Sequence, residues 1–271
     1  MCGQYAIVSS IERIEKKFNV KQEPELAFSV NRIVIPGNQG LVITDNEPRL
    51  IQSFTFGFTP SWSKKATYII NARSEGDHNK ENRMDYNGAK GIITKPFFRK
   101  AIRQQRCLVI ADCFLEGPTK ERLKKPFAVY MKNYERPFAF AGIWDSWKNP
   151  DTGKVMNTFA IITSPANKLL AKIPHHRMPV ILSPSSYSRY LSTSRPLSDI
   201  TELLVPYPYE AMNAFPISPA YKKHYDDARL ALHPIGQRLE KEYDFKVNEE
   251  IKLFGMGELP SRELRDRKAN N

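Results

Sequence analysis

The sequence has few cysteines, no long apolar run and a shortage of acidic residues. Its three cysteines, Cys2, Cys107 and Cys113, are too few and too irregularly spaced for a disulfide framework or a zinc site. No apolar run approaches the ~20 residues that a membrane-spanning helix needs, and charged residues interrupt the N-terminal region, which argues against a secretory signal. We therefore expect a cytoplasmic protein without a membrane segment.

The shortage of acidic residues leaves the chain strongly basic. Against 41 Lys and Arg there are 29 Asp and Glu, which gives a formal net charge of +12. A polyanion such as nucleic acid is the natural partner of such a chain, and a generally basic surface without a polyanionic partner is the alternative. With 271 residues and 41% hydrophobic residues, the chain can bury the core of one large domain or of two small ones.

The spacing of apolar residues predicts short strands mixed with short helices. The expected strands cover residues 4–9, 32–35, 53–58, 68–70, 107–111, 127–131, 138–147, 159–163 and 180–182. The expected helices cover residues 11–18, 95–106, 164–170, 185–191 and 200–204. Ser9 with Glu12 forms a capping-box pattern before the first helix, and residues 19–50 are loop-rich apart from one strand. One β-rich α+β domain is the simplest architecture.

The first residues, Met1-Cys2-Gly3-Gln4, carry an unusual chemical possibility. Removal of Met1 would leave Cys2 with a free α-amine and a thiol on adjacent carbons, and both groups are partly nucleophilic at neutral pH. Such an aminothiol condenses with an aldehyde to an imine, and the thiol then closes a five-membered thiazolidine. An ordinary small buried cysteine is the alternative interpretation.

Three more polar residues stand at the ends of apolar segments. Asn71 follows the apolar residues 68–70, and Glu116 ends the stretch that begins at Cys107. His175 lies in Ile-Pro-His-His-Arg-Met-Pro, where two prolines stiffen the backbone. A buried glutamate and a histidine are the usual carriers of protons in catalysis. A surface glutamate and a solvent-exposed loop histidine are the competing interpretations.

Together these motifs resemble those of the SOS response-associated peptidase (SRAP) family. The similarity comprises Met-Cys-Gly, Asn-Ala-Arg-Ser-Glu, Arg-Cys-Leu before a strand ending in Glu-Gly, and the His-His-Arg segment, and it extends to about Pro206. The resemblance implies a single compact α+β domain with a β-barrel-like core flanked by helices. It also implies a basic groove for single-stranded DNA containing abasic sites. We expect this domain to span 1–255, with a flexible basic tail over 256–271.

The resemblance also implies roles for individual residues. Cys2 is the nucleophile, Asn71 and Glu116 line the site, and His175 is the acid–base histidine. Arg73, Arg177 and, on the basic helix, Arg106 are expected to contact phosphates, and Trp62 to stack on a base. The chain departs from the family at Gln4, where an arginine is common, and this removes one candidate phosphate contact.

The expected activity is a covalent thiazolidine crosslink to an abasic site, with weak lyase activity and autoproteolytic removal of Met1. His175 is expected to act as the acid that opens the sugar, and Glu116 as the base. The chemistry needs no metal and no organic cofactor, and we expect a monomer. Two alternatives stay open at this point: a cysteine peptidase that acts on other proteins, and a non-covalent binder of single-stranded nucleic acid.

Overall fold

The computed structural model describes residues 3–132 and 136–242. The predictions on Cys2, on Met1 and on the tail 256–271 therefore lie outside the described residues, as does the expected domain boundary at 255.

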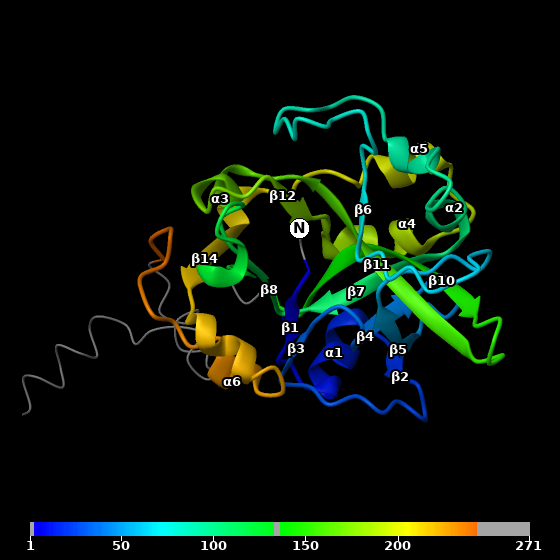
Figure 1. Cartoon of the computed structure of the whole chain (residues 1–271), viewed down its shortest axis with the longest axis horizontal. Coiled ribbons are helices and arrows are strands. Elements are labelled where there is room, and N and C mark those ends of the chain that lie inside the picture. Colours follow the sequence, from blue (N-terminus) through cyan, green and yellow to red (C-terminus); the bar gives the residue numbers. More distant parts are fainter. Residues whose placement is uncertain (1–2, 133–135, 243–271) are drawn as a thin grey trace, which may run out of the picture.

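Five strands close into a barrel at the centre of the molecule (Figure 1). Around the ring, antiparallel pairs join β5 to β4, β4 to β7, β7 to β10 and β10 to β11, and a parallel pair of β11 with β5 closes it. Closure leaves no unpaired edge within the ring. The ring strands are β4 (Gln39–Thr44), β5 (Leu50–Phe56), β7 (Arg106–Ala111), β10 (Phe138–Lys148) and β11 (Val155–Pro165).

Shorter strands extend this sheet. Near its C-terminal end β11 pairs with β6 and with β12, while β13 pairs with β10 and β2 with β5. These strands are β2 (Lys21–Gln22), β6 (Asn71–Arg73), β12 (Arg177–Pro179) and β13 (Ile181–Leu182). β6 and β12 are about a hundred residues apart in sequence, and both pair with the C-terminal part of β11.

A second sheet has the order β14-β9-β8-β1-β3. Its strands are β1 (Tyr5–Ile7), β3 (Arg32–Val34), β8 (Cys113–Glu116), β9 (Phe127–Met131) and β14 (Met212–Pro216). The chain passes from the barrel strand β7 into β8 at Asp112. Its carboxylate accepts hydrogen bonds from the backbone N–H of Val8 (2.6 Å) and of Ser9 (2.8 Å) and from the Ser9 hydroxyl. This buried carboxylate ties the end of β1 to the point where the chain changes sheets.

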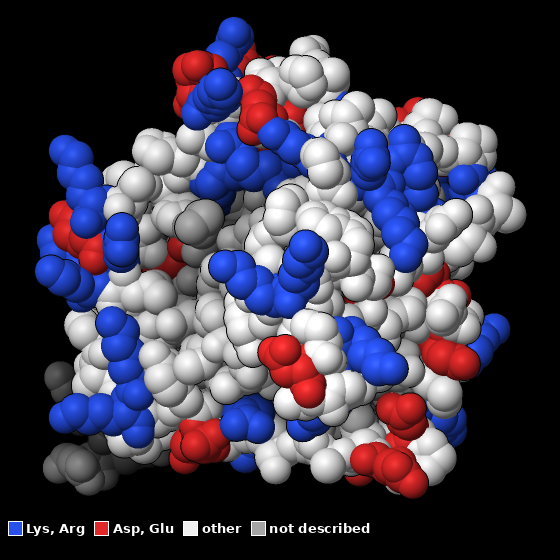
Figure 2. Space-filling model, turned by 45° about the vertical axis from the view of Figure 1, so that its right-hand side comes forward, with Lys and Arg blue, Asp and Glu red and all other residues white. Residues whose placement is uncertain are grey.

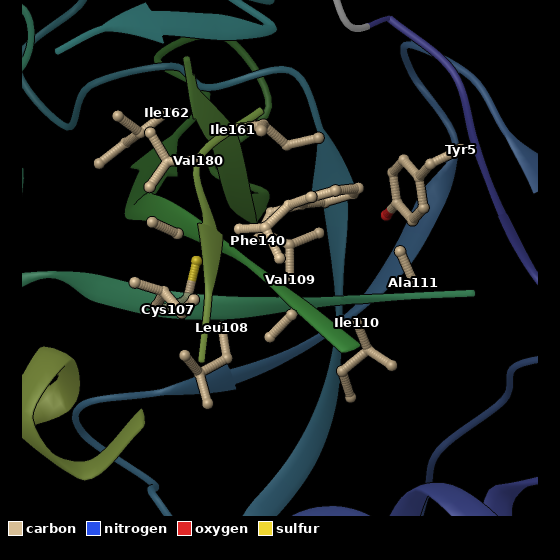
Figure 3. Packing of buried hydrophobic residues seen from close by; sticks show 14 of the residues in the cluster. Tyr5, Cys107, Leu108, Val109, Ile110, Ala111, Phe140, Ile161, Ile162 and Val180 are labelled. Carbon is tan, nitrogen blue, oxygen red and sulfur yellow. The ribbon is translucent and has the colours of Figure 1, made fainter. Parts of the chain in front are cut away.

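The core fills the barrel and the space between the two sheets (Figure 3). Tyr5 from β1 packs edge to face on Phe56 and Phe140, with ring centroids 5.8 and 5.9 Å apart. Runs such as Cys107–Ala111 are buried on both faces, as expected for strands covered on both sides. The N-terminal strand is therefore part of the main core, and its first residues are held close to the barrel.

Helices are short and lie at the periphery. The α-helices are α1 (Ile11–Phe18), α2 (Ala101–Gln104), α3 (Lys168–Lys172), α4 (Tyr187–Leu191), α5 (Leu197–Thr201) and α6 (Ala228–Ala231). The 3-10 turns are η1 (Gly91–Ile93), η2 (Arg122–Lys124), η3 (Pro184–Ser186), η4 (Tyr209–Ala211) and η5 (Pro219–Lys223). Among the described residues, no helix has the length and apolar character needed to cross a membrane.

The expected α+β domain with a barrel-like core is confirmed, but some elements differ from prediction. Strand β4 was not predicted, because residues 19–50 contain several prolines and polar residues. The helix expected over 95–106 contracts to α2, since 96–100 forms turns and Arg106 already belongs to β7. Ser10, not Ser9, caps α1 by accepting from the Arg13 N–H, because the Ser9 hydroxyl is bound to Asp112.

Candidate active site

The first described residues run alongside β8. Tyr5 is paired with Phe114, and the Gln4 carbonyl accepts a hydrogen bond of 2.9 Å from the Leu115 N–H. Glu116 is the next residue on β8, so the beginning of the described chain lies beside Glu116. The Gln4 side chain accepts a hydrogen bond of 2.7 Å from the Tyr221 hydroxyl, which fixes this residue against the second sheet. In Figure 1 the N-terminal end of β1 lies between β8 and β12.

Glu116 and His175 form a buried pair at this position. The Oε2 atom of Glu116 lies 3.2 Å from Nε2 of His175, and the two side chains are 4% and 7% exposed. On the opposite side of the imidazole ring, Nδ1 lies 2.8 Å from the Gly117 carbonyl oxygen. The sequence placed these residues 59 positions apart on different segments, and the fold brings them into contact.

The hydrogen-bond partners restrict where the pair can hold a proton. A carbonyl only accepts, so Nδ1 must carry a hydrogen, and in a neutral imidazole Nε2 is then an acceptor. Burial lowers the pKa of His175 to about 4, and the nearby charge of Arg177 acts in the same direction. The lowered pKa favours a neutral His175 at neutral pH, which differs from the expectation that a fraction of it is protonated there. A hydrogen bond between Nε2 and Glu116 then requires the proton on the carboxyl.

The loop after β8 supports His175. The Gly117 carbonyl accepts from the ring, while the Thr119 N–H and hydroxyl both donate to the Pro174 carbonyl at 3.0 Å. Gly117 is required because a Cβ there would lie 2.0 Å from the Arg122 carbonyl oxygen. Sequence analysis missed Thr119, since its partner is 55 residues away and no local pattern marks it.

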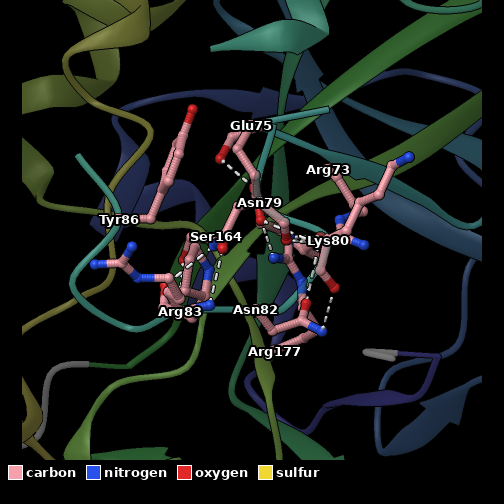
Figure 4. Close-up of polar contacts among 12 residues, drawn as sticks. Arg73, Glu75, Asn79, Lys80, Asn82, Arg83, Tyr86, Ser164 and Arg177 are labelled. Atoms are coloured by element: carbon pink, nitrogen blue, oxygen red, sulfur yellow. Dashed lines mark hydrogen bonds and ion pairs between the residues drawn. The ribbon is translucent and has the colours of Figure 1, made fainter. Parts of the chain in front are cut away.

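A second cluster joins β6 to β12 across the end of β11 (Figure 4). The guanidinium of Arg177 forms two hydrogen bonds to the carboxylate of Glu75, which is fully buried, and two more to the carbonyl and hydroxyl of Thr163. Burial acts to raise the pKa of Glu75, but the hydrogen bonds and charge of Arg177 outweigh it and hold that pKa below its ordinary value. Glu75 is part of the Asn-Ala-Arg-Ser-Glu motif, but nothing in the sequence indicates that its partner is Arg177.

These contacts change the predicted role of Arg177. Its side chain is 9% exposed, and both of its NH groups bind protein oxygens. The expectation of a phosphate contact is therefore wrong for this arrangement: Arg177 neutralises Glu75 and holds the segment that carries His175. Arg73 is 37% exposed and lies 3.5 Å from Glu75. It also donates to the Asn79 carbonyl and the Asn82 side chain, so it is partly open to a ligand.

Arg106 is also not a surface residue. It is 1% exposed, and its guanidinium donates to the backbone carbonyls of Ile102, Arg103, Tyr190 and Ser192. The expected DNA contact is wrong, because a guanidinium enclosed by four carbonyls cannot reach a phosphate. The Arg106 side chain instead connects α2 and α4 to β7 through these hydrogen bonds.

Asn71 and Trp62 lie on different segments: Asn71 pairs with Ile161 of β11, and the turn that carries Trp62 contacts β10 near the β10–β11 hairpin. Asn71 is the first residue of β6, half-buried and paired with Ile161. Trp62 is 56% exposed and contacts Phe97, with ring centroids 5.1 Å apart. The turn that carries Trp62 is held by the Ser61 N–H on Asp145 and by Trp147 Nε1 on the Ser63 carbonyl. Stacking of Trp62 on a base stays a prediction.

The surface charge is consistent with an anionic partner. Figure 2 shows Lys and Arg side chains bordering a hollow in the upper left of this face, while Asp and Glu side chains gather towards the lower right. Within residues 3–132 and 136–242, no group of three or more His, Cys, Asp or Glu side chains is arranged to hold a metal ion. The polar groups of the candidate site are the buried Glu116–His175 pair, the buried Arg177–Glu75 ion pair and the partly exposed Arg73.

Fold and site together define a class of protein: a small barrel domain whose N-terminal strand begins beside a buried glutamate–histidine pair. Comparison with known proteins identifies the class. A model of the family "SOS response associated peptidase (SRAP)" matches residues 1–224, and the chain belongs to this family. The family resemblance of the sequence motifs is confirmed.

Named relatives agree with this assignment. The chain is 32% identical over 225 residues to the abasic site processing protein YoqW of Bacillus subtilis, covering 80% of this chain and 92% of that protein. It is 25% identical over 194 residues to the abasic site processing protein HMCES of Xenopus tropicalis, covering 64% of this chain and 54% of that protein. A crystal structure of a Bacteroides thetaiotaomicron protein superposes with a TM-score of 0.69 at 25% identity, covering 82% and 94% of the two chains.

Proposed function

We propose that this protein processes abasic sites in single-stranded DNA by forming a thiazolidine crosslink through Cys2 after removal of Met1. The observation that carries the proposal is the buried Glu116–His175 pair beside the first described residues of β1. The names of the relatives, which process abasic sites, support the substrate class.

The other cysteines support Cys2 as the nucleophile by elimination. Cys107 and Cys113 are fully buried, and burial raises the pKa of both thiols. A buried neutral thiol is a poor nucleophile. Of the three cysteines in the chain, Cys2 is the remaining candidate.

The geometry favours a proton assignment opposite to the one expected from ordinary pKa values. Glu116, as the protonated member, donates its proton to the ring oxygen of the sugar, while Nε2 of His175 accepts the proton of the C1′ hydroxyl, so that the ring opens to the aldehyde. The protonated imidazole then stabilises the carboxylate that remains. The α-amine adds to the aldehyde carbon, and water leaves to give the imine. The thiol sulfur then adds to the imine carbon, its proton passes to the nitrogen, and the thiazolidine closes. The same imine can eliminate at the β carbon, which accounts for a weak lyase activity.

A denaturing gel of protein mixed with abasic single-stranded DNA tests the proposal. The parent chain should give a heat-stable adduct. Cys2→Ala keeps an amine but no sulfur, so it should give only an imine, which a borohydride traps. Cys113→Ala is the matched control and should crosslink like the parent. Equal heat-stable adduct from Cys2→Ala would refute the mechanism.

The same samples separate the two alternatives. A peptidase acting on other proteins would cleave added peptides, whereas autoproteolysis changes only the mass of the chain itself by the loss of Met1. A non-covalent binder would retain DNA in a salt-sensitive way on a native gel and leave no adduct under denaturing conditions.

A further inference from the structure

The loop that joins β8 to β9 starts directly after Glu116 and is folded back on itself. A Cβ at Gly117 would lie 2.0 Å from the Arg122 carbonyl oxygen and 2.8 Å from that of Lys125, so the returning limb packs on this glycine. The Arg122 N–H donates to the Pro118 carbonyl across the loop. Residues 117–125 thus form a compact projection beside the catalytic pair, and we call them the β8–β9 loop.

This loop and His175 are held as one unit. Three hydrogen bonds connect them: His175 Nδ1 with the Gly117 carbonyl at 2.8 Å, and the two donors of Thr119 with the Pro174 carbonyl at 3.0 Å. A ligand that binds the loop is therefore placed at a defined position relative to the Glu116–His175 pair.

The β8–β9 loop concentrates positive charge. It contains four cations and one carboxylate, Glu121, which lies 3.8 Å from Lys125. Lys120, Arg122 and Lys124 are exposed, and within the described ranges none of them has a carboxylate within 4.0 Å. Some other cations of the molecule are paired, such as Arg83 with Asp85 and Arg189 with Glu202, whereas these three lie together on one short loop.

We propose that Lys120, Arg122 and Lys124 bind the phosphates of the DNA strand next to the abasic nucleotide. The inference rests on the proposed function, because that function places the abasic sugar at Glu116 and His175. Every sugar in a strand has a phosphate on each side, so a sugar in this position brings an anion to the loop. Release of condensed counterions from that strand supplies the binding free energy.

Salt-dependent binding of a fluorescent, undamaged oligothymidylate tests the proposal. The variant Lys120→Gln/Arg122→Gln/Lys124→Gln removes three charges from the loop. The control Lys16→Gln/Lys148→Gln/Lys154→Gln removes three exposed charges from α1 and the β10–β11 hairpin, away from the N-terminal end of β1 in Figure 1. Each lost phosphate contact should flatten the slope of log K against log salt by about 0.7. We therefore expect the loop variant to lose about 2 units of slope and the control almost none.

The outcomes separate this proposal from the proposed function. If the parent forms no crosslink but the loop variant has a flatter salt slope than the parent, the crosslinking mechanism is refuted and phosphate binding by the β8–β9 loop is supported. If the parent crosslinks and both variants keep the parental slope, the loop proposal is overturned. A third variant, Arg99→Gln/Lys100→Gln/Arg103→Gln, removes three cations from the surface near Phe97. The loop proposal is also overturned if this variant loses about 2 units of slope while the loop variant keeps the parental slope. Should the triple variant not fold, Lys120→Gln and Lys124→Gln alone should each lose about 0.7.

Discussion

The imidazole of His175 is a single group whose burial gives a measurable pH dependence. In the unfolded chain a histidine titrates near pH ~6.5, whereas the folded pKa is about 4. Between these values the unfolded state binds more protons, so folding becomes less stable as the pH falls through this window, by about 1.4 kcal/mol per pH unit. Above the window the contribution is fully present.

Comparison of the parent with His175→Asn isolates this effect from the carboxylates. We expect the stability of the parent, relative to the variant, to fall as the pH decreases from ~6.5 to about 4, measured by urea unfolding. A constant difference across this window would show that His175 is not held neutral by burial. The crosslinking rate of the parent should likewise show no inflection near pH ~6.5.

Arg177 and Arg73 provide a second contrast between single residues. Arg177→Ala leaves the buried carboxylate of Glu75 without its main partner, which should cost about 3–5 kcal/mol of unfolding free energy. Arg73→Ala removes a side chain that is 37% exposed and 3.5 Å from Glu75, and its cost should be below about 1 kcal/mol.

Salt-dependent DNA binding distinguishes the two arginines further. Arg73→Ala should flatten the salt slope by about 0.7, because this guanidinium remains partly exposed. A stability loss below ~1 kcal/mol for Arg177→Ala would contradict the structural role assigned to it.

Among the elements, the β8–β9 loop decides how His175 is held. Thr119→Val removes the hydroxyl donor to the Pro174 carbonyl but keeps the side-chain shape, at a cost of about 0.5–1.5 kcal/mol. We expect crosslinking at saturating DNA to slow several-fold and its pH profile to shift, while DNA affinity stays unchanged. Thr119→Ser retains the hydroxyl and should restore the parental pH profile. If Thr119→Val keeps the parental rate and profile, the bond has no positioning role.

At the scale of the whole molecule, the described chain continues past the family match at residue 224 and pairs with β14. The Ile235 N–H donates to the Pro216 carbonyl, and the Leu239 N–H donates to the Ala214 carbonyl. Asn213 exchanges two hydrogen bonds with the backbone of Glu240. The segment thereby covers the edge of the second sheet.

Ending the chain after Ala231 should therefore lower the thermal midpoint by several degrees and promote association, because β14 becomes an open edge. Asn213→Ala is the matched variant with an intact chain, and it should lower the midpoint less. Thermal unfolding with light scattering measures both effects. An unchanged midpoint in the truncated chain would show that the segment does not stabilise the sheet.

The sequence by itself determined the class of fold, most strands and the catalytic candidates. Alternating and continuous runs of apolar residues are visible in the sequence itself, and they predict the strands over residues 107–111, 127–131 and 138–147. Glu116 and His175 were recognisable because a polar group stands at the end of an apolar segment or between prolines. Local information of this kind is enough to select residues.

Only the tertiary structure decided what those residues contact. Arg73, Arg106 and Arg177 are the same type of residue and look alike in the sequence. Their different exposures result from segments up to about a hundred residues away that pack against them. The 3.2 Å contact between Glu116 and His175, and the carbonyl of Gly117 behind the ring, likewise depend on how β8 and the segment before β12 meet. Burial and hydrogen-bond partners determine the protonation state of a side chain, and both are properties of the folded chain.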